Sequence, residues 1–161
     1  MEKMPITRAG FARLKRELEV LKTVSIPANI KDIEAARAQG DLSENAEYAA
    51  AKERQSFLHG KMQELENALA TSNVIDLKNL SCEKAVFGSY VTIEDGNDGK
   101  KITYQLVGPY ESDLDINRLS VTSPIGKALI GMGVGDEVRV ETPGGVREFE
   151  IVDISVQDEA E

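Results

Sequence analysis

Two carboxylates, Asp41 and Glu44, stand three positions apart in the segment GDLSENAEYAAAK, residues 40–52, between two stretches with helical patterns. One interpretation is a capping box, with Asp41 as the N-cap of the next helix and Glu44 at N3, where acids also suit the helix dipole. Ser43 is an alternative cap, which would leave both acids with less structural purpose. The other interpretation is a metal site, because Mg²⁺ prefers carboxylate oxygens. Spacing alone favours the capping box.

Two carboxylates are too few to hold Mg²⁺ tightly, because the ion keeps about six oxygen ligands at roughly 2.0–2.1 Å. They can complete a site whose other ligands come from a partner's carboxylates and a phosphate. In a two-metal phosphoryl-transfer centre, the second ion lies about 3.5–4 Å from the first and helps to generate the attacking hydroxide. Acids at the far end of a long arm are well placed for such delivery. Their position therefore favours a metal half-site.

The segment before the acids has the pattern of a long helix. Thr7 can cap it, with Ile6 and Phe11 at the two positions of a hydrophobic staple. Apolar residues then recur at steps of three and four, except for one step of five where Pro27 lies. Because proline removes a helix bond, we expect a kink or a fresh helix start there, after Ser25 or Ile26. The predicted stripe comprises Phe11, Leu14, Leu18, Leu21, Ile26, Ile30 and Ile33.

The segment after the acids predicts a second helix over residues 44–71, about 40 Å long at roughly 1.5 Å per residue. Its stripe keeps alternating steps of three and four through Tyr48, Ala51, Gln55, Leu58, Met62, Leu65 and Leu69. Two such helices joined by a short turn bury their stripes against each other. Residues 1–78 are therefore predicted to form an all-α antiparallel coiled-coil hairpin with its tip near 40–45.

Residues 79–161 have a different pattern, with a period of two and frequent turn residues. Strands are predicted at 86–94, 101–107, 118–122, 137–141 and 147–156, with turns at 96–99 and 143–145. The segment SPIGKALIG predicts one short helix, with Ser123 as its cap, Pro124 at its first position and Gly131 as its terminator. The second domain is thus predicted to be an α+β globule, with a mostly antiparallel sheet.

Composition restricts the possible functions. The chain has 161 residues and a net charge of −9. Residues 1–78 hold 12 basic and 12 acidic side chains, so the whole excess of negative charge lies in residues 79–161. A surface that binds free nucleic acid is usually basic, so free nucleic acid is expected to bind at most weakly. No apolar run is long enough to span a membrane.

The single cysteine and the single histidine do not indicate an independent enzyme. Cys82 is the single cysteine, which suits a reducing cytoplasm and excludes both an internal disulfide and a zinc site built from several cysteines. His59 is the single histidine, lies one step off the predicted stripe, and is expected to face solvent. Nothing else in the chain marks a catalytic triad with these two residues.

The segment EAARAQGDLSENAEYAAAKE resembles the hallmark of the Gre family of bacterial transcript cleavage factors, and SPIGKALIGMGVGDEV with TPGG and EFEI resembles that family's C-terminal signature. The resemblance covers essentially the whole chain. It implies an FKBP-like fold without isomerase activity for the C-terminal globule, which docks on bacterial RNA polymerase. The coiled coil would enter the secondary channel and stimulate Mg²⁺-dependent hydrolysis of the nascent RNA 3′ end in backtracked complexes. The acidic balance favours the less basic of the two Gre types.

The resemblance also implies roles for individual residues. Asp41 corresponds to the Mg²⁺ ligand, and Glu44 would orient or deprotonate the water. Residues that shape the tip would be Leu42, Ser43, Asn45 and Tyr48. Arg37 and Lys52 match basic positions that would meet RNA phosphates or the channel wall.

In the globule, Thr122, Ser123 and Pro124 correspond to the turn that contacts polymerase in this family. Two positions depart from the family pattern: Thr122 stands where Asn or Asp is common, and Met132 stands where lysine is frequent.

Two alternative functions remain open at this stage. One is a Gre-like factor that binds the same channel and inhibits or modulates polymerase without cleavage. The other, from outside the family, is a coiled-coil chaperone or adaptor that grips unfolded clients. The intact pair of acids favours cleavage over inhibition, and the scarcity of apolar residues at 40–48 disfavours a chaperone.

Overall fold

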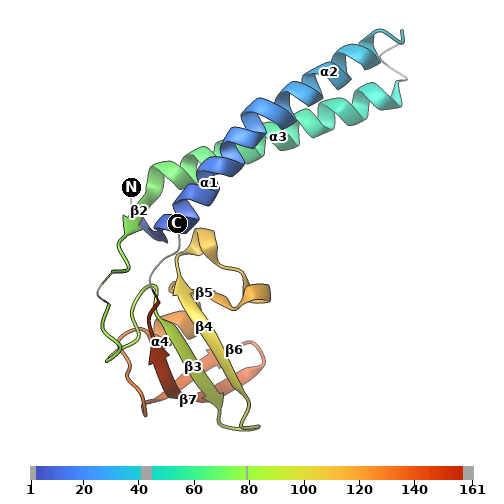
Figure 1. Ribbon diagram of the computed structural model, residues 1–161. Coiled ribbons are helices and arrows are strands. Elements are labelled where there is room, and N and C mark those ends of the chain that lie inside the picture. Colours follow the sequence, from blue (N-terminus) through green and yellow to red (C-terminus); the bar gives the residue numbers. More distant parts are fainter. Residues whose placement is uncertain (1–2, 41–44, 79, 158–161) are drawn as a thin grey trace. The chain divides into compact units, whose positions relative to one another are not determined.

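The computed structural model describes residues 3–40, 45–78 and 80–157. The chain divides into two compact units, one formed by Ala12–Thr71 and the other by Met1–Phe11 together with Ser72–Glu161. The predicted two-part fold is confirmed: a helical hairpin is followed by a sheet-rich globular part (Figure 1). By packing, however, residues 3–11 and 72–78 belong with the sheet, although periodicity places them in the hairpin. No helix in the described ranges is long and apolar enough to cross a lipid bilayer.

The hairpin consists of α1 (Arg8–Val20), the π-helical turn η1 (Leu21–Ser25), α2 (Ile26–Arg37) and α3 (Ala46–Thr71). The cross-contacts show that α3 runs antiparallel to the first three elements, because Lys22 faces Glu66 at 3.7 Å whereas Asn29 bonds to Ala51. Figure 1 shows α2 and α3 side by side. The buried seam comprises Leu14, Leu21, Ile33, Ala36, Leu58, Leu65 and Ala68.

The step of five in the apolar pattern becomes the π-helical turn. The Ile26 N–H donates to the Leu21 carbonyl oxygen five residues earlier, and this wider turn accommodates the extra residue. The predicted irregularity lies just before Pro27, but the helix does not start afresh there. Val20, Ser25 and Ile26 all keep helical backbone angles, and no side chain caps α2, so α1, η1 and α2 follow one another without a break. One residue of the predicted stripe is wrong, because Ile30 is exposed and Asn29 is buried in its place. Asn29 Nδ2 donates to the Ala51 carbonyl oxygen at 3.0 Å, which satisfies the buried amide.

A short parallel pair of strands that periodicity does not predict joins the two ends of the hairpin segment. Strand β1 (Met4–Thr7) pairs with β2 (Ser72–Ile75), with Ile6 opposite Val74. The predicted cap is confirmed next to it, since the Gly10 N–H donates to Thr7 Oγ1 at 3.0 Å at the start of α1.

Glu111 fastens this corner to the rest of its unit. Its carboxylate is 4% exposed and accepts hydrogen bonds from the Thr7 backbone N–H, at 2.7 Å, and from the Thr7 hydroxyl. Two glycines make room for the approach: a Cβ at Gly10 would overlap the Glu111 side chain, and a Cβ at Gly108 would overlap the Pro5 carbonyl oxygen. Side chains at either glycine would therefore displace the corner.

The main sheet has the strand order β5-β4-β3-β7-β6 and is antiparallel except for the β4–β5 pair. Its strands are β3 (Tyr90–Asp95), β4 (Lys101–Val107), β5 (Arg118–Ser120), β6 (Glu137–Thr142) and β7 (Gly145–Ser155). All five predicted strands are present, but the first begins later than predicted, because Gly88 adopts a φ of 88° in a turn before it. Helix α4 (Pro124–Leu129) contributes Leu129 to a core with Val91, Ile93, Leu106 and Ile151.

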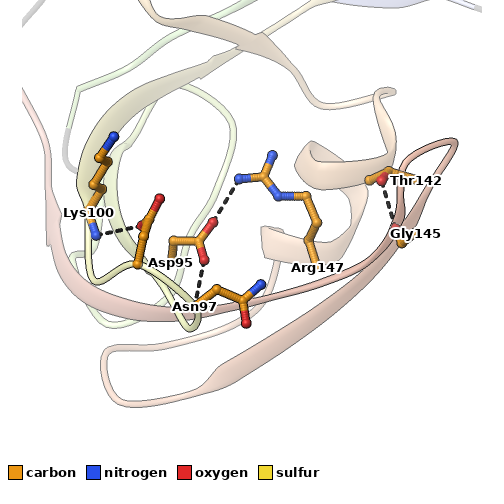
Figure 2. Close-up of polar contacts among 7 residues, drawn as sticks. Asp95, Asn97, Lys100, Thr142, Gly145 and Arg147 are labelled. Carbon is orange, nitrogen blue, oxygen red and sulfur yellow. Dashed lines mark hydrogen bonds and ion pairs between the residues drawn. The ribbon is translucent and has the colours of Figure 1, made fainter.

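Polar contacts close the two hairpin turns of the sheet (Figure 2). Arg147 pairs with Asp95 at 2.8 Å while its guanidinium lies 4.8 Å from the centre of the Phe149 ring. The hydrogen bond from Arg147 lowers the pKa of Asp95, and the bond from the Asn97 backbone N–H lowers it further. In the β6–β7 turn, Thr142 Oγ1 donates to the Gly145 carbonyl oxygen at 2.7 Å. The predicted turns at 96–99 and 143–145 are thus confirmed.

Two smaller elements connect the sheet to the corner. The 3₁₀ turns η2 (Pro109–Glu111) and η3 (Leu114–Ile116) lie between β4 and β5. Asp113 caps η3 by accepting from the Asp115 N–H, and Asn117 ends it in the left-handed conformation. Turn η2 is the element that carries Glu111 toward β1.

Candidate functional site

The end of the hairpin is where the first candidate site lies. The last described residues before the tip tighten the end of α2: the Gln39 N–H donates to the Ala36 carbonyl oxygen at 3.2 Å, and the Gly40 N–H to that of Arg37 at 3.3 Å. Gly40 has a φ of 111°, a conformation that glycine adopts without the steric penalty of a side chain. Helix α2 ends at Arg37 with Ala38 as its C-cap, and Gly40 follows two residues after the cap with its positive φ.

Asn45 closes the other side of the tip. Its Oδ1 accepts from the Tyr48 N–H at 3.0 Å, which is the N3 position of α3, and its Nδ2 donates to the Ala36 carbonyl oxygen at 2.7 Å. The capping-box interpretation is therefore wrong for α3, because the helix begins at Ala46 and its cap is Asn45. An amide serves here because it can accept from one helix and donate to the other, which neither a carboxylate nor a single capping bond accomplishes.

Asp41, Leu42, Ser43 and Glu44 lie outside the described residues, so their predicted roles remain predictions. The described residues on either side still show whether the start of α3 needs a cap from these four residues. The Tyr48 N–H has its partner in Asn45, and Glu47 supplies an acid in the first turn of α3. The start of α3 therefore requires neither Asp41 nor Glu44 as its cap.

The basic residues predicted to meet RNA or the channel wall lie on both helices near the tip. Arg37 is exposed in the last turn of α2. Lys52 is exposed on α3, and its Nζ donates to Gln55 Oε1 at 2.8 Å. Tyr48 is half-buried. This arrangement places positive charge on each side of the connection that carries the acids, which is compatible with a phosphate ligand.

Asp41 and Glu44 can serve as Mg²⁺ ligands only if other groups supply the rest of the coordination shell. Asp41 and Glu44 offer hard carboxylate oxygens, which suit this ion. In the part of the chain that the structure describes, no group of three or more His, Cys, Asp or Glu side chains is arranged to hold a metal. A site built on Asp41 and Glu44 alone would leave most of the roughly six-ligand shell of Mg²⁺ to other groups.

The second candidate site is the turn before α4. The Gly126 N–H donates to Ser123 Oγ at 3.1 Å, and Ser123 Oγ donates to the Ser120 carbonyl oxygen at 2.6 Å. Ser123 is therefore committed to capping α4, as predicted. Thr122 is exposed and shares a 2.7 Å hydrogen bond between its hydroxyl and that of Ser120, and Pro124 is exposed beside it.

In this turn, the side chains that are exposed differ from the side chain that holds the turn in shape. Only Thr122 and Pro124 present exposed side chains, whereas Ser123 is half-buried. Met132, at the position where lysine is frequent in the family, packs against the core. A Cβ at Gly126 would overlap the Ser120 carbonyl oxygen, so this glycine allows α4 to lie close to β5. Periodicity did not identify Gly126, because its requirement comes from a neighbouring strand.

Replacing Asn45 by alanine is expected to destabilise the hairpin by about 1 kcal/mol, because α3 loses its cap. For a chain of this length, that change lowers the melting temperature by roughly 2–4 °C. Asn45→Asp keeps an acceptor for the Tyr48 N–H but loses the bond to Ala36, so its loss should be smaller. Thermal unfolding followed by circular dichroism measures both. Unchanged melting in Asn45→Ala would contradict the capping role.

Fold and site together define a class: a two-unit protein in which a helical hairpin carries a pair of acids at its turn and a sheet unit follows. Two family models match the chain: "Transcription elongation factor, N-terminal" over residues 4–74 and "Transcription elongation factor, GreA/GreB, C-term" over residues 80–156. The chain belongs to the GreA/GreB family of transcription elongation factors.

Two relatives by sequence agree with this assignment. The chain is 70% identical over 156 residues to transcription elongation factor GreA of Syntrophus aciditrophicus (strain SB), covering 97% of each sequence. It is 51% identical to GreA of Rhodospirillum rubrum, over 94% of this chain and 96% of the relative. Among solved structures, it is 30% identical to GreA factor homolog 1 of Thermus thermophilus, covering 95% of this chain and 99% of that chain, with a TM-score of 0.45.

Proposed function

We propose that this elongation factor binds bacterial RNA polymerase, inserts its hairpin into the secondary channel, and stimulates cleavage of the nascent RNA 3′ end in backtracked complexes. The observation that carries the proposal is the tip itself. Within a family of transcription elongation factors, the residues between Gly40, which follows the end of α2, and the Asn45 cap of α3 are Asp41, Leu42, Ser43 and Glu44. The Asn45–Ala36 bond holds the two helix ends together on either side of these acids.

The acids divide the chemistry between them in this proposal. Asp41 would hold a Mg²⁺ ion that polymerase carboxylates and an RNA phosphate also bind. Glu44 would orient the attacking water and accept its proton. When bound, such an ion makes water more acidic and stabilises charge on the phosphate oxygens. Arg37 and Lys52 would face the RNA phosphates or the channel wall and would favour the approach of the 3′ end electrostatically.

The proposed factor has no activity of its own, because two carboxylates cannot complete the coordination of Mg²⁺. In the sheet unit, the exposed side chains of Thr122 and Pro124 would contact polymerase, and Ser123 would keep their turn in shape.

Cleavage of labelled RNA in purified backtracked elongation complexes tests the proposal. With Mg²⁺, the wild-type protein is expected to shorten the RNA from its 3′ end, and Asp41→Asn/Glu44→Gln is expected to lose this activity while still binding polymerase. Glu47→Gln is the matched control, because Glu47 is an exposed acid in the first turn of α3 and is not assigned to the site. It should cleave like the wild type.

The remaining outcomes discriminate among functions. Equal cleavage by the wild type and the double variant would contradict the roles of the acids. Binding that slows RNA synthesis without cleavage would instead support the inhibitory factor. RNA shortened by the protein in the absence of polymerase would contradict the half-site, since the isolated acids should not hydrolyse RNA.

A further inference from the structure

A groove lies along the helical unit, far in sequence from the acids at the tip. Its volume is about 490 Å³, and it is lined by α1, the π-helical turn η1 and one face of α3. Its apolar lining comes from Val20 and Leu21 on one side and Leu65 on the other. The groove is open to solvent within this unit, and the proposed function assigns no role to it.

The π-helical turn contributes directly to the groove. Leu21 and Ser25, the two ends of this turn, both line it. A π turn widens the backbone locally and changes the direction of the side chains around it, and such turns are often found at functional positions. Val20, the last residue of α1, is 53% exposed, although Leu21 beside it is buried. The site of the helix irregularity is thus also a site of exposed apolar surface.

Charged residues surround the apolar lining with a positive balance. Arg13, Arg16 and Lys61 supply three positive charges against the single negative charge of Glu17. Glu64 lies 3.7 Å from Lys61, but both side chains are largely exposed, so this pair is weak. This local excess of positive charge lies in residues 1–78, where basic and acidic side chains are equal in number overall.

The dimensions of the groove suit a helix. From Arg13 to Ser25 the first helical stretch rises about 18 Å at roughly 1.5 Å per residue, which corresponds to about three turns of a partner helix. On α3, Phe57, Lys61 and Leu65 recur every four residues and so share one face. Phe57, which is 66% exposed, lies one turn beyond Lys61 and outside the groove lining.

We propose that this groove binds an amphipathic helix of a protein partner, with acidic side chains flanking a row of apolar ones. The apolar row would cover Val20, Leu21 and Leu65, and the acids would pair with Arg13, Arg16 and Lys61. Helices commonly bind in grooves in this way, through apolar anchors three and four residues apart. RNA is a poorer ligand, because its phosphates gain nothing from the apolar lining and are repelled by Glu17. The proposal goes beyond transcript cleavage and does not depend on it.

Fluorescence anisotropy with the full-length protein tests the groove. The probes are fluorescein-labelled 14-residue helical peptides with leucines spaced three and four apart and flanking glutamates, in three registers of the leucine row. A matched set carries lysines in place of the glutamates, and a 12-nucleotide single-stranded RNA is the third probe. At least one acidic peptide is expected to bind saturably and to bind more weakly at high salt. The lysine peptides should bind at least about tenfold more weakly.

Two pairs of variants locate the binding. Val20→Gln should weaken the acidic peptide at least about tenfold, whereas Val134→Gln, at a valine that is 58% exposed in the other unit, should not. Arg16→Glu should weaken it similarly, whereas Arg54→Glu, at an exposed arginine of α3 outside the groove lining, should have little effect. Circular dichroism confirms that each variant is folded.

Four results would overturn the proposal. The first is that no acidic peptide binds saturably, and the second is that the lysine peptides bind as tightly as the acidic ones. The third is that Val20→Gln and Val134→Gln have equal effects. The fourth is that RNA binds in a way that depends on Arg16 while the acidic peptides do not bind. None of them would affect the cleavage assay, in which the groove takes no part.

Discussion

Replacing Asp41 by asparagine is expected to slow transcript cleavage by at least roughly 100-fold at ordinary Mg²⁺ concentration, because even the loss of a residue that only supports a metal ligand costs up to about 100-fold. The amide keeps the size of the side chain and removes its charge, so the loss is one of metal affinity. Raising the Mg²⁺ concentration should therefore restore part of the rate, because mass action compensates for weaker binding. A Mg²⁺ titration of single-turnover cleavage measures this shift.

Glu44→Gln should behave differently in the same titration. If Glu44 orients the water and accepts its proton, its loss reduces the rate by roughly 10²–10⁴-fold, the usual contribution of a positioned acid–base group. Added Mg²⁺ should not restore that rate, because the ion's affinity is not what changed. The reverse pattern, with Glu44→Gln rescued and Asp41→Asn not, would exchange the two roles. Normal cleavage by both single variants would contradict the proposed site.

The second large effect is expected at Gly108. Its backbone, with φ −81° and ψ 170°, suits alanine, so backbone strain is not the problem. The added Cβ would overlap the Pro5 carbonyl oxygen and lie 2.9 Å from the Pro5 carbonyl carbon. Both are backbone atoms of β1, so no side chain can move aside. The strand carries Ile6, which is 0% exposed, and Thr7, which bonds to Glu111.

Gly108→Ala is therefore expected to lower the free energy of unfolding by about 3 kcal/mol, the upper end of the range for overpacking. For a chain of this length the melting temperature should fall by roughly 6–12 °C. Gly60→Ala is the control: Gly60 lies within α3 with no atom within 4 Å of an added Cβ, so alanine should stabilise the helix by up to about 1 kcal/mol. Differential scanning calorimetry measures both. A Gly108→Ala protein as stable as the wild type would show that β1 is not held against this glycine.

The tip and the Gly108 corner have different roles in this protein. In the proposed function, the acids at the tip supply chemistry that requires a second protein. The corner around Gly108 and Glu111 holds the two ends of the hairpin segment, β1 and β2, in one unit with the sheet. A protein that contributes only part of a metal site must present it on a stable support, because an ordered support reduces the entropy lost on binding. The antiparallel seam and the Asn45–Ala36 bond provide that order within the hairpin.

Local pattern was sufficient for most elements of the fold. Repeated steps of three and four predict the helices because every third or fourth side chain returns to the same face. The cap at Thr7, the irregularity before Pro27 and the Ser123 cap of α4 were all predictable, since each depends on residues within one helical turn. The turn residues between 96 and 99 likewise mark the β3–β4 hairpin.

The errors involve contacts between distant residues. Asn29 replaces Ile30 in the seam because Ala51, across the hairpin, offers a carbonyl oxygen to its amide. Asn45 caps α3 in preference to Asp41 because its amide also reaches Ala36 on the opposite helix. An i-to-i+3 pattern cannot distinguish these choices, because each depends on an atom of another element.

By itself, the sequence determined the two-part organisation, the hairpin, the position of its turn and the pair of acids within that turn, because periodicity, capping and turn chemistry are local properties. Only the tertiary structure decided that β1 pairs with β2, that Glu111 and Gly108 hold this corner, and that the π-helical turn opens a groove beside it in the helical seam. These features arise where segments far apart in the chain meet, and no local pattern records which segment will be the neighbour.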